Sequence, residues 1–149
     1  MHKLNLPEYP IKRRSMGEKE EVFDVVRKKY VALTPEEWVR QHFINFLIRE
    51  KHTPASLISV ERKLIFNGMP GRTDLVVYNR QAEPKMVIEC KSAEVKISQD
   101  VFDQIARYNM TLKVNYLIVT NGIEHFCCRM DYNRQKYQFV DNIPDYEEL

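Results

Sequence analysis

The sequence predicts a mixed α/β (α+β) fold, in which helices flank a central mixed β-sheet behind an N-terminal β-hairpin or arm. Apolar residues recur at helical spacing over 35–51 and 100–112. Short strand-like runs bounded by turn residues lie at 60–66, 73–78, 85–91 and 115–120. Because a helix separates the last two runs, they should be parallel neighbours joined by a right-handed crossover.

The N-terminal segment is basic and interrupted by proline. Pro7 and Pro10 favour extended backbone, so residues 1–14 predict an arm or an edge strand. Residues 15–18 can turn the chain back into a strand at 22–26. Residues 1–30 are therefore expected to form an arm or hairpin. The basic run 27–29 fits either a solvated face or a phosphate contact.

The first helix has a clear start. Thr34 is a good N-cap, Pro35 suits the first helical position, and Glu37 completes a capping box. Trp38 is expected to anchor the helix in the core. The helix should end near Lys51, before the next proline.

The remaining elements complete one domain over residues 1–149, with its core at 33–130. Asn67-Gly68 and Pro70-Gly71 predict a turn after the 60–66 strand. A terminal hairpin is expected from 123–129 and 137–140, and the acidic tail should lie at the surface.

Composition excludes several classes of protein. Of 149 residues, 44% are hydrophobic and 30% charged, with a net charge of +2, which argues against disorder and permits a nucleic-acid partner. No apolar run approaches the ~20 residues of a membrane span, and the N-terminus lacks a secretory signal. Three cysteines without framework or zinc spacing indicate reduced thiols in the cytoplasm.

Two neighbouring strand-like runs carry the residues best suited to chemistry. Asp74 lies near the start of one, and Glu89-Cys90-Lys91 closes the next. If the two strands form an antiparallel hairpin, the carboxylates can converge on a Mg²⁺ or Mn²⁺ ion, with Lys91 on the same face as Glu89. Such a site can hydrolyse a phosphodiester. Cys90 should face the buried side. Glu-x-Lys is also a common surface ion pair on strands.

At this point the sequence resembles the PD-(D/E)xK nuclease superfamily, specifically the N-terminal nuclease domain of type I restriction enzyme R subunits. The resemblance covers roughly residues 33–130. It rests on the segments 36–41 (EEWVRQ), 71–74 (GRTD), 87–91 (VIECK), 103–108 (DQIARY) and 119–122 (VTNG).

The resemblance implies roles for individual residues. Asp74 and Glu89 would bind Mg²⁺ or Mn²⁺, and Lys91 would act beside the scissile phosphate. Gln104 and Tyr108, one turn apart, match the Gln-x-x-x-Tyr element of such nucleases. Glu37 would be the first-helix acid that some members aim at the metal, although it also fits the capping box alone.

Basic residues near this site are candidate DNA contacts. Arg62, Lys63 and Arg72 could line a DNA groove or form a solvated strand edge. Arg40 could contact a phosphate or pair with Glu36 or Glu37. His42 is expected to be a hydrogen-bonded helix residue.

The sequence therefore predicts a metal-dependent DNA endonuclease of the restriction-modification kind, in which water attacks directly. It has no Walker motif, so ATP-driven translocation is not expected of these residues alone. DNA and a separate motor or modification subunit are the expected partners, and double-strand cuts would require a homodimer or repeated nicking. The alternatives are a non-catalytic nucleic-acid-binding or complex-forming module and a domain that only oligomerises.

Overall fold

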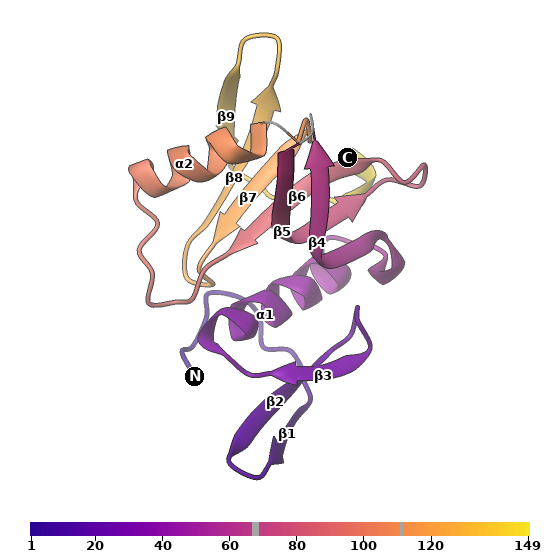
Figure 1. Ribbon diagram of the computed structural model, residues 1–149, viewed down its shortest axis with the longest axis vertical. Helices are drawn as coiled ribbons and strands as arrows, with labels where there is room; N and C mark the ends of the chain where they lie inside the picture. Colours follow the sequence, from indigo (N-terminus) through magenta and orange to yellow (C-terminus); the bar gives the residue numbers. More distant parts are fainter. Residues whose placement is uncertain (67–68, 111) are drawn as a thin grey trace.

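The computed structural model describes residues 1–66, 69–110 and 112–149; the side chains of residues 62–66, 69–72 and 108 also lie outside the description. In the described part, the strands form a three-stranded and a six-stranded sheet. The helix α1 (Pro35–Glu50) lies between these two sheets (Figure 1). The predicted mixed fold is confirmed.

The small sheet is antiparallel and lies at the N-terminal end of the chain. It consists of β1 (Arg13–Met16), β2 (Lys19–Asp24) and β3 (Lys29–Ala32) in that order. The N-terminal hairpin expected from the sequence is therefore present. Its third strand was not predicted, since the basic run 27–29 was expected to be a solvated face or a phosphate contact.

The large sheet has the order β4-β5-β6-β7-β8-β9 and is antiparallel except at one place. β6 and β7 are parallel, as the expected crossover requires. The strands are β4 (Ile58–Phe66), β5 (Met69–Tyr78), β6 (Pro84–Cys90), β7 (Tyr116–Thr120), β8 (His125–Asp131) and β9 (Lys136–Val140).

One turn prediction was partly wrong. Pro70-Gly71 belongs to β5, where Pro70 pairs with Ile65 and Gly71 with Leu64, so the strand begins before the residues that were expected to end a turn. Proline is tolerated there because the ladder does not need every N–H at the beginning of a strand. Asn67-Gly68 lies outside the described residues.

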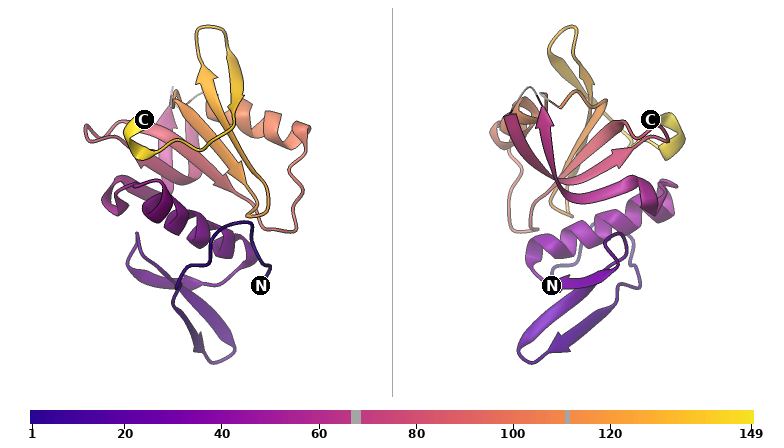
Figure 2. Two further views of the ribbon diagram at one scale, coloured as in Figure 1. Left: turned by 180° about the vertical axis from the view of Figure 1, so that it is seen from behind. Right: turned by 45° about the vertical axis from the view of Figure 1, so that its right-hand side comes forward.

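Each helix covers one face of the large sheet (Figure 2). Alternate residues of the central strands point to opposite sides. Leu75, Val77 and Ile88 pack with α1, whereas Val76 and Val87 belong to a second core with α2 (Gln99–Met110). The two cores are separate because the sheet lies between them.

The helix α1 is buried on nearly its whole circumference. Its apolar side packs on the large sheet, and polar residues such as Gln41, His42 and Asn45 are also less than 9% exposed. The small sheet and the N-terminal segment cover that polar side (Figure 1). Thr34 caps the helix by accepting a 3.0 Å hydrogen bond from the Glu37 N–H, and the Nδ1 of His42 contacts the Trp38 carbonyl at 2.8 Å. Trp38 is only partly buried and packs against the edge of this core.

The first residues of the chain are tied to a turn more than 100 residues later. The Asn5 N–H donates to the carbonyl of Gly122 at 2.8 Å. Gly122 has φ +85°, and a Cβ there would meet the Cδ2 atom of Leu4 at 2.7 Å. Glycine is therefore required both by the left-handed backbone and by the close approach of Leu4.

Short 3₁₀ turns complete the chain at η1 (Ala55–Leu57) and η2 (Tyr146–Glu148). The acidic tail is mostly at the surface as predicted, but Tyr146 is buried and its hydroxyl donates to the Tyr78 carbonyl. Within the described residues, neither helix has the length and apolarity needed to cross a bilayer.

Candidate active site

The β5–β6 hairpin brings Asp74 and Glu89 together. Leu75 pairs with Ile88, and the next residues outward in this register are Asp74 and Glu89. The Cys90 N–H donates to Asp74 Oδ2 at 2.8 Å, which fixes the orientation of that carboxylate. The antiparallel arrangement on which the sequence argument depended is thus present, and Cys90 is buried as expected.

Glu89 is a carboxylate in an unfavourable environment. Burial raises its pKa first, followed by the charge of Asp74 and a hydrogen bond with Asp74, and together they bring the pKa to about 8. Among the described residues, Glu89 Oε1 is buried without a hydrogen-bond partner. Near neutral pH this environment favours the protonated acid unless a cation is bound beside it.

These features fit a hard divalent cation. Magnesium is commonly bound by one or two carboxylates together with waters and substrate phosphate oxygens. Asp74 and Glu89 supply such a pair, and the unpartnered Glu89 oxygen is a donor that a cation would satisfy. In the described part of the chain, no group of three or more His, Cys, Asp or Glu side chains is arranged around one position for a metal.

Lys91 directly follows β6 and is half-buried. Its N–H donates to the Thr120 carbonyl at 2.8 Å, which ties it to the end of the neighbouring β7. Its ammonium charge opposes the rise in the pKa of Glu89, so the two side chains interact electrostatically. The positive charge of Lys91 therefore acts on Glu89, as the Glu-x-Lys spacing leads one to expect.

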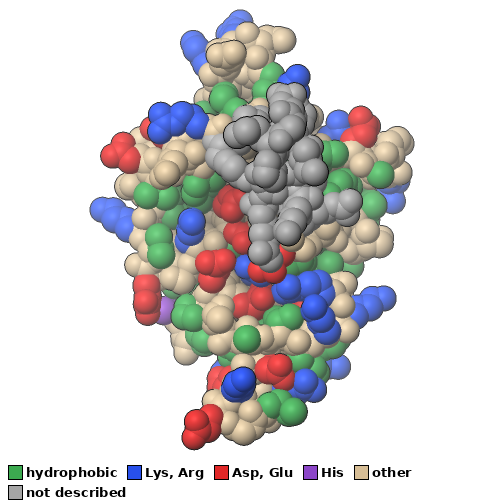
Figure 3. Space-filling model, in the orientation of Figure 1, with side chains coloured by type: hydrophobic (Ala, Val, Ile, Leu, Met, Phe, Trp, Pro, Cys, Tyr) green, Lys and Arg blue, Asp and Glu red, His purple; other side chains and the backbone are tan. Residues whose placement is uncertain are grey.

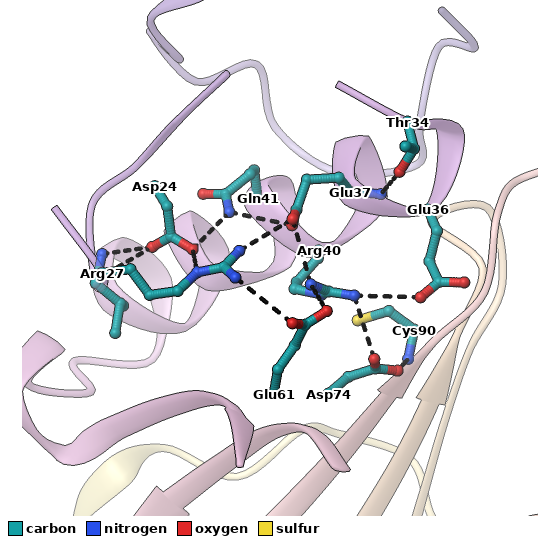
Figure 4. Close-up of polar contacts among 11 residues, drawn as sticks. Asp24, Arg27, Thr34, Glu36, Glu37, Arg40, Gln41, Glu61, Asp74 and Cys90 are labelled. Carbon is teal, nitrogen blue, oxygen red and sulfur yellow. Dashed lines mark hydrogen bonds and ion pairs between the residues drawn. The ribbon is translucent and has the colours of Figure 1, made fainter. Parts of the chain in front are cut away.

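Glu37 does not join this pair directly. Its Oε1 accepts from Arg27 at 3.0 Å and from Arg40 at 3.3 Å, and its Oε2 accepts from Gln41 at 3.3 Å (Figure 4). The Thr34 half of the predicted capping box is present, but these contacts direct the Glu37 carboxylate toward the interior. Arg40 lies between Glu37 and Asp74, since it contacts both.

Arg40 is one of the most heavily paired residues of the site. It is 4% exposed, and its terminal nitrogens contact four carboxylates. The pairing with Glu36 and Glu37 that the sequence offered as an alternative to a phosphate contact is present, at 3.2 Å and 3.3 Å. A phosphate could reach this guanidinium only by displacing a carboxylate.

Glu61 also belongs to the site, although sequence reasoning did not include it. Val60 pairs with Leu75 and Arg62 with Thr73, which leaves Glu61 opposite Asp74. Glu61 Oε1 accepts from Arg40 at 3.0 Å. Only the pairing of β4 with β5 reveals this, because nothing in the local sequence distinguishes Glu61 from a surface glutamate.

An open groove of about 540 Å³ runs beside these residues. Acidic side chains gather on this face next to lysine and arginine side chains (Figure 3). The groove is lined by Arg27, Ala32, Thr34, Pro35, Glu36, Glu37, Arg40, Glu61 and Ser92.

The other predicted site residues are less directly placed. Gln104 is exposed on α2, the helix that packs on the sheet face opposite α1. The described contacts of the carboxylate pair do not include Gln104. The side chains of Tyr108, Arg62, Lys63 and Arg72 lie outside the described residues, so their predicted roles remain predictions.

The fold and this site define a class of protein. It is a mixed α+β domain in which two carboxylates and a lysine lie at the end of a β-hairpin. The family of type I restriction enzyme R protein N-termini (HSDR_N) matches residues 35–144. Since this match spans more than half of the chain, the protein belongs to that family. The resemblance noted from the sequence is confirmed.

A solved structure supports the fold. It is a fragment assigned to an HsdR subunit of a type I restriction enzyme from Vibrio vulnificus, with a TM-score of 0.53 and 21% identity. The match covers 78% of this chain but only 24% of the solved one. A comparison with curated proteins gives no match.

Proposed function

We propose that this domain hydrolyses phosphodiester bonds of DNA with the help of Mg²⁺ or Mn²⁺. The observation that carries the proposal is the pair of Asp74 and Glu89 just beyond the last paired residues of the β5–β6 hairpin, in which a buried carboxylate oxygen has no partner among the described residues and Lys91 lies two residues after Glu89. Membership of the R protein family supports the same reaction class.

The roles of the residues follow from their contacts. The Cys90 N–H holds Asp74 Oδ2, so this carboxylate is oriented before the ion arrives. Glu89 would give up its proton and offer Oε1 to the ion. A bound divalent ion would orient the phosphate, lower the pKa of the attacking water and offset charge on the phosphate oxygens.

Lys91 would bind a non-bridging phosphate oxygen, since its positive charge acts on Glu89 and a cation there would stabilise the charge that develops during in-line attack. Gln104, with Tyr108, would approach from α2. Glu37 would act through Arg40. The attack is by water, so no covalent bond forms between enzyme and DNA.

The proposed setting is cytoplasmic, and the proposed partners are DNA and a separate motor or modification subunit of the type I kind. Double-strand cuts would require two centres, which a homodimer would supply.

Nicking of supercoiled plasmid tests the proposal. With Mg²⁺ or Mn²⁺, the Asp74→Ala and Glu89→Gln proteins should lose about 1000-fold in rate, because several kcal/mol of metal-derived stabilisation are removed. Lys91→Ala should lose about 100-fold. Asp131→Asn, a surface carboxylate on β8, is the matched control and should cut normally. Equal cutting by all four variants would overturn the proposal.

Calorimetric titration of the metals separates binding from cleavage. Binding lost in the Asp74→Ala/Glu89→Ala protein would place the ion between these carboxylates. Salt-sensitive DNA binding that persists in EDTA, with no nicking under any metal condition, would instead favour the non-catalytic binding module.

A further inference from the structure

The two faces of the small sheet have different surroundings. Val22 and Asp24 on β2 are 0% exposed, and Asp24 accepts a 3.0 Å hydrogen bond from Gln41 of α1, so their face packs on that helix (Figure 1). Because side chains alternate along a strand, Phe23 points the other way, with Tyr30 of β3 as its cross-strand partner. Among the described residues, neither ring belongs to the two hydrophobic cores. Two half-buried aromatic rings therefore lie on the outer face of the small sheet.

This outer face is also basic. By register it consists of Lys12, Arg14, Met16, Lys19, Glu21, Phe23, Tyr30 and Ala32. Its three cations are all exposed, and it carries one carboxylate. The face therefore combines a net positive charge with an aromatic surface.

The cations lie directly beside the rings. Lys12 Nζ is 5.8 Å from the centre of the Phe23 ring, and the Arg14 guanidinium carbon is 3.9 Å from the centre of the Tyr30 ring. Arg14 Nε also donates to Glu21 at 2.8 Å, and the arginine side chain is 45% exposed. The planar guanidinium is thus held over the Tyr30 ring and remains accessible to a ligand.

This combination suits a single strand of nucleic acid. Bases stack on aromatic rings and on arginine guanidinium planes, and basic side chains bind the phosphates between them. Bases in a duplex are already stacked on one another, so a stacking surface favours an unpaired strand. A protein partner fits this face less well, because lysine is depleted in the cores of protein–protein interfaces.

The outer face is continuous with the groove beside the carboxylates. Ala32 lies opposite Glu21 on the outer face and also lines the groove, together with Thr34. On this side of the molecule, lysine and arginine side chains lie next to the acidic ones (Figure 3). A strand that follows β3 across Tyr30 would therefore reach the groove two residues later.

We propose that the outer face of the small sheet binds single-stranded DNA and leads it into the groove. Bases stack on Phe23, Tyr30 and the Arg14 guanidinium, and Lys12 and Lys19 bind phosphates. The inference rests on the proposed function only in taking DNA as the ligand, and binding at this face needs no metal ion.

Fluorescence anisotropy of a labelled oligothymidylate tests the stacking surface. An oligonucleotide of about 20 nucleotides is long enough for such a site, and EDTA prevents metal-dependent cleavage. The wild-type protein should bind it more tightly than a duplex of the same length. Tyr30→Leu removes the ring but keeps an apolar side chain and should lose about 10-fold in affinity. Tyr30→Phe keeps the ring and should bind as the wild type does.

Salt dependence tests the phosphate contacts. Each cation that binds a phosphate of a single strand contributes about 0.7 to the slope of log affinity against log salt. Lys12→Gln/Lys19→Gln should therefore reduce the slope by about 1.4. Lys136→Gln is the matched control, because Lys136 is also an exposed lysine but lies on β9, at the edge of the large sheet (Figure 1). Its slope should equal that of the wild type.

Cross-linking of the wild-type protein decides the matter if Tyr30→Leu does not fold. An oligonucleotide that carries 5-iododeoxyuridine should form its photo-adduct on Phe23 or Tyr30, mapped by mass spectrometry. Adducts confined to residues outside the small sheet would overturn the inference. So would wild-type affinity in folded Tyr30→Leu, an unchanged salt slope in Lys12→Gln/Lys19→Gln, or equal affinity for the strand and the duplex.

Plasmid nicking, which Asp74→Ala should abolish, judges the proposed function separately. Nicking by a protein that does not bind the oligonucleotide at this face would overturn the inference and leave the proposed function intact. Binding at this face without nicking under any metal condition would support the inference and overturn the proposed function.

Discussion

Asp24 and Glu89 are both carboxylates largely shielded from water. Hydrogen-bond donors surround Asp24, whereas another carboxylate lies next to Glu89. Asp24 is 0% exposed and accepts hydrogen bonds from the N–H groups of Val26 and Arg27, from the Arg27 guanidinium and from Gln41. Burial acts to raise its pKa, but these hydrogen bonds outweigh burial, and the pKa is lowered. Glu89 has its pKa raised to about 8.

The contrast separates a structural acid from a candidate functional one. Every contact of Asp24 comes from within the chain, and together they join β2, the turn after it and α1. Glu89 has a neighbouring carboxylate and an oxygen without a partner among the described residues. A largely buried acid in this environment is a candidate for ligand binding or proton transfer, because the free energy lost by burying it is recovered only when a ligand binds.

The largest expected effect comes from removing the structural acid. Asp24→Ala should lower the free energy of unfolding by about 3–5 kcal/mol, because Arg27 and Gln41 lose their buried partner. Urea unfolding at pH 7 measures it. A loss below about 1 kcal/mol would show that the network around Asp24 does not hold the small sheet against α1.

Replacing Glu89, the candidate functional acid, should change stability in the opposite direction. The folded pKa of Glu89, about 8, lies above the ordinary 4.5, so the native state keeps a proton that the unfolded chain loses. The stability of the metal-free protein should therefore fall as pH rises from about 4.5 to 8. Glu89→Gln should remove this slope and raise stability near pH 8 by on the order of 2 kcal/mol. Urea unfolding across that pH range, in EDTA, checks it.

The matched comparison is Asp24→Asn over the acid range. Because the pKa of Asp24 is lowered from 3.8, its contribution is present above that pH and is lost as pH falls through the folded value. The wild-type advantage over Asp24→Asn should therefore shrink in acid. Parallel pH slopes for the Asp24 and Glu89 variants would remove the distinction between the two acids.

The smallest expected effect comes from the N-cap of α1, and it tests whether the start of this helix contributes to the site beyond its stability. Thr34→Ala removes the N-cap and should cost about 1 kcal/mol of stability. Metal affinity should stay the same, since the carboxylates of Asp74 and Glu89 are held by β5 and β6. A tenfold change in Mn²⁺ affinity would mean that the start of α1 also shapes the metal site.

The hairpin and its carboxylate pair could be predicted because they depend on local signals. All of these signals lie within 20 residues of sequence. They are two β-branched runs, the polar connection between them, and Asp74 near the start of the first run and Glu89 near the end of the second. The cap at Thr34 is equally local. Residues brought in by long-range pairing were not predictable: Glu61 joins the site through the β4–β5 register, and Asp24 is buried only because the small sheet lies against α1.

The polar side of α1 shows the same limit. Gln41, His42 and Asn45 are polar residues on the side of α1 away from the large sheet, yet all three are buried. Local periodicity gives the side of a helix that packs on the main sheet, and it cannot show that a second sheet covers the rest.

The tie between Asn5 and Gly122 bears on the order in which the protein forms during synthesis. The first residues leave the ribosome early, but the turn that receives them is made more than 100 residues later. Until that turn has been synthesised, Leu4 has no Gly122 to pack against, so the N-terminal segment cannot dock. Its seating should therefore be among the last events of folding, after α1 and the β5–β6 hairpin have formed.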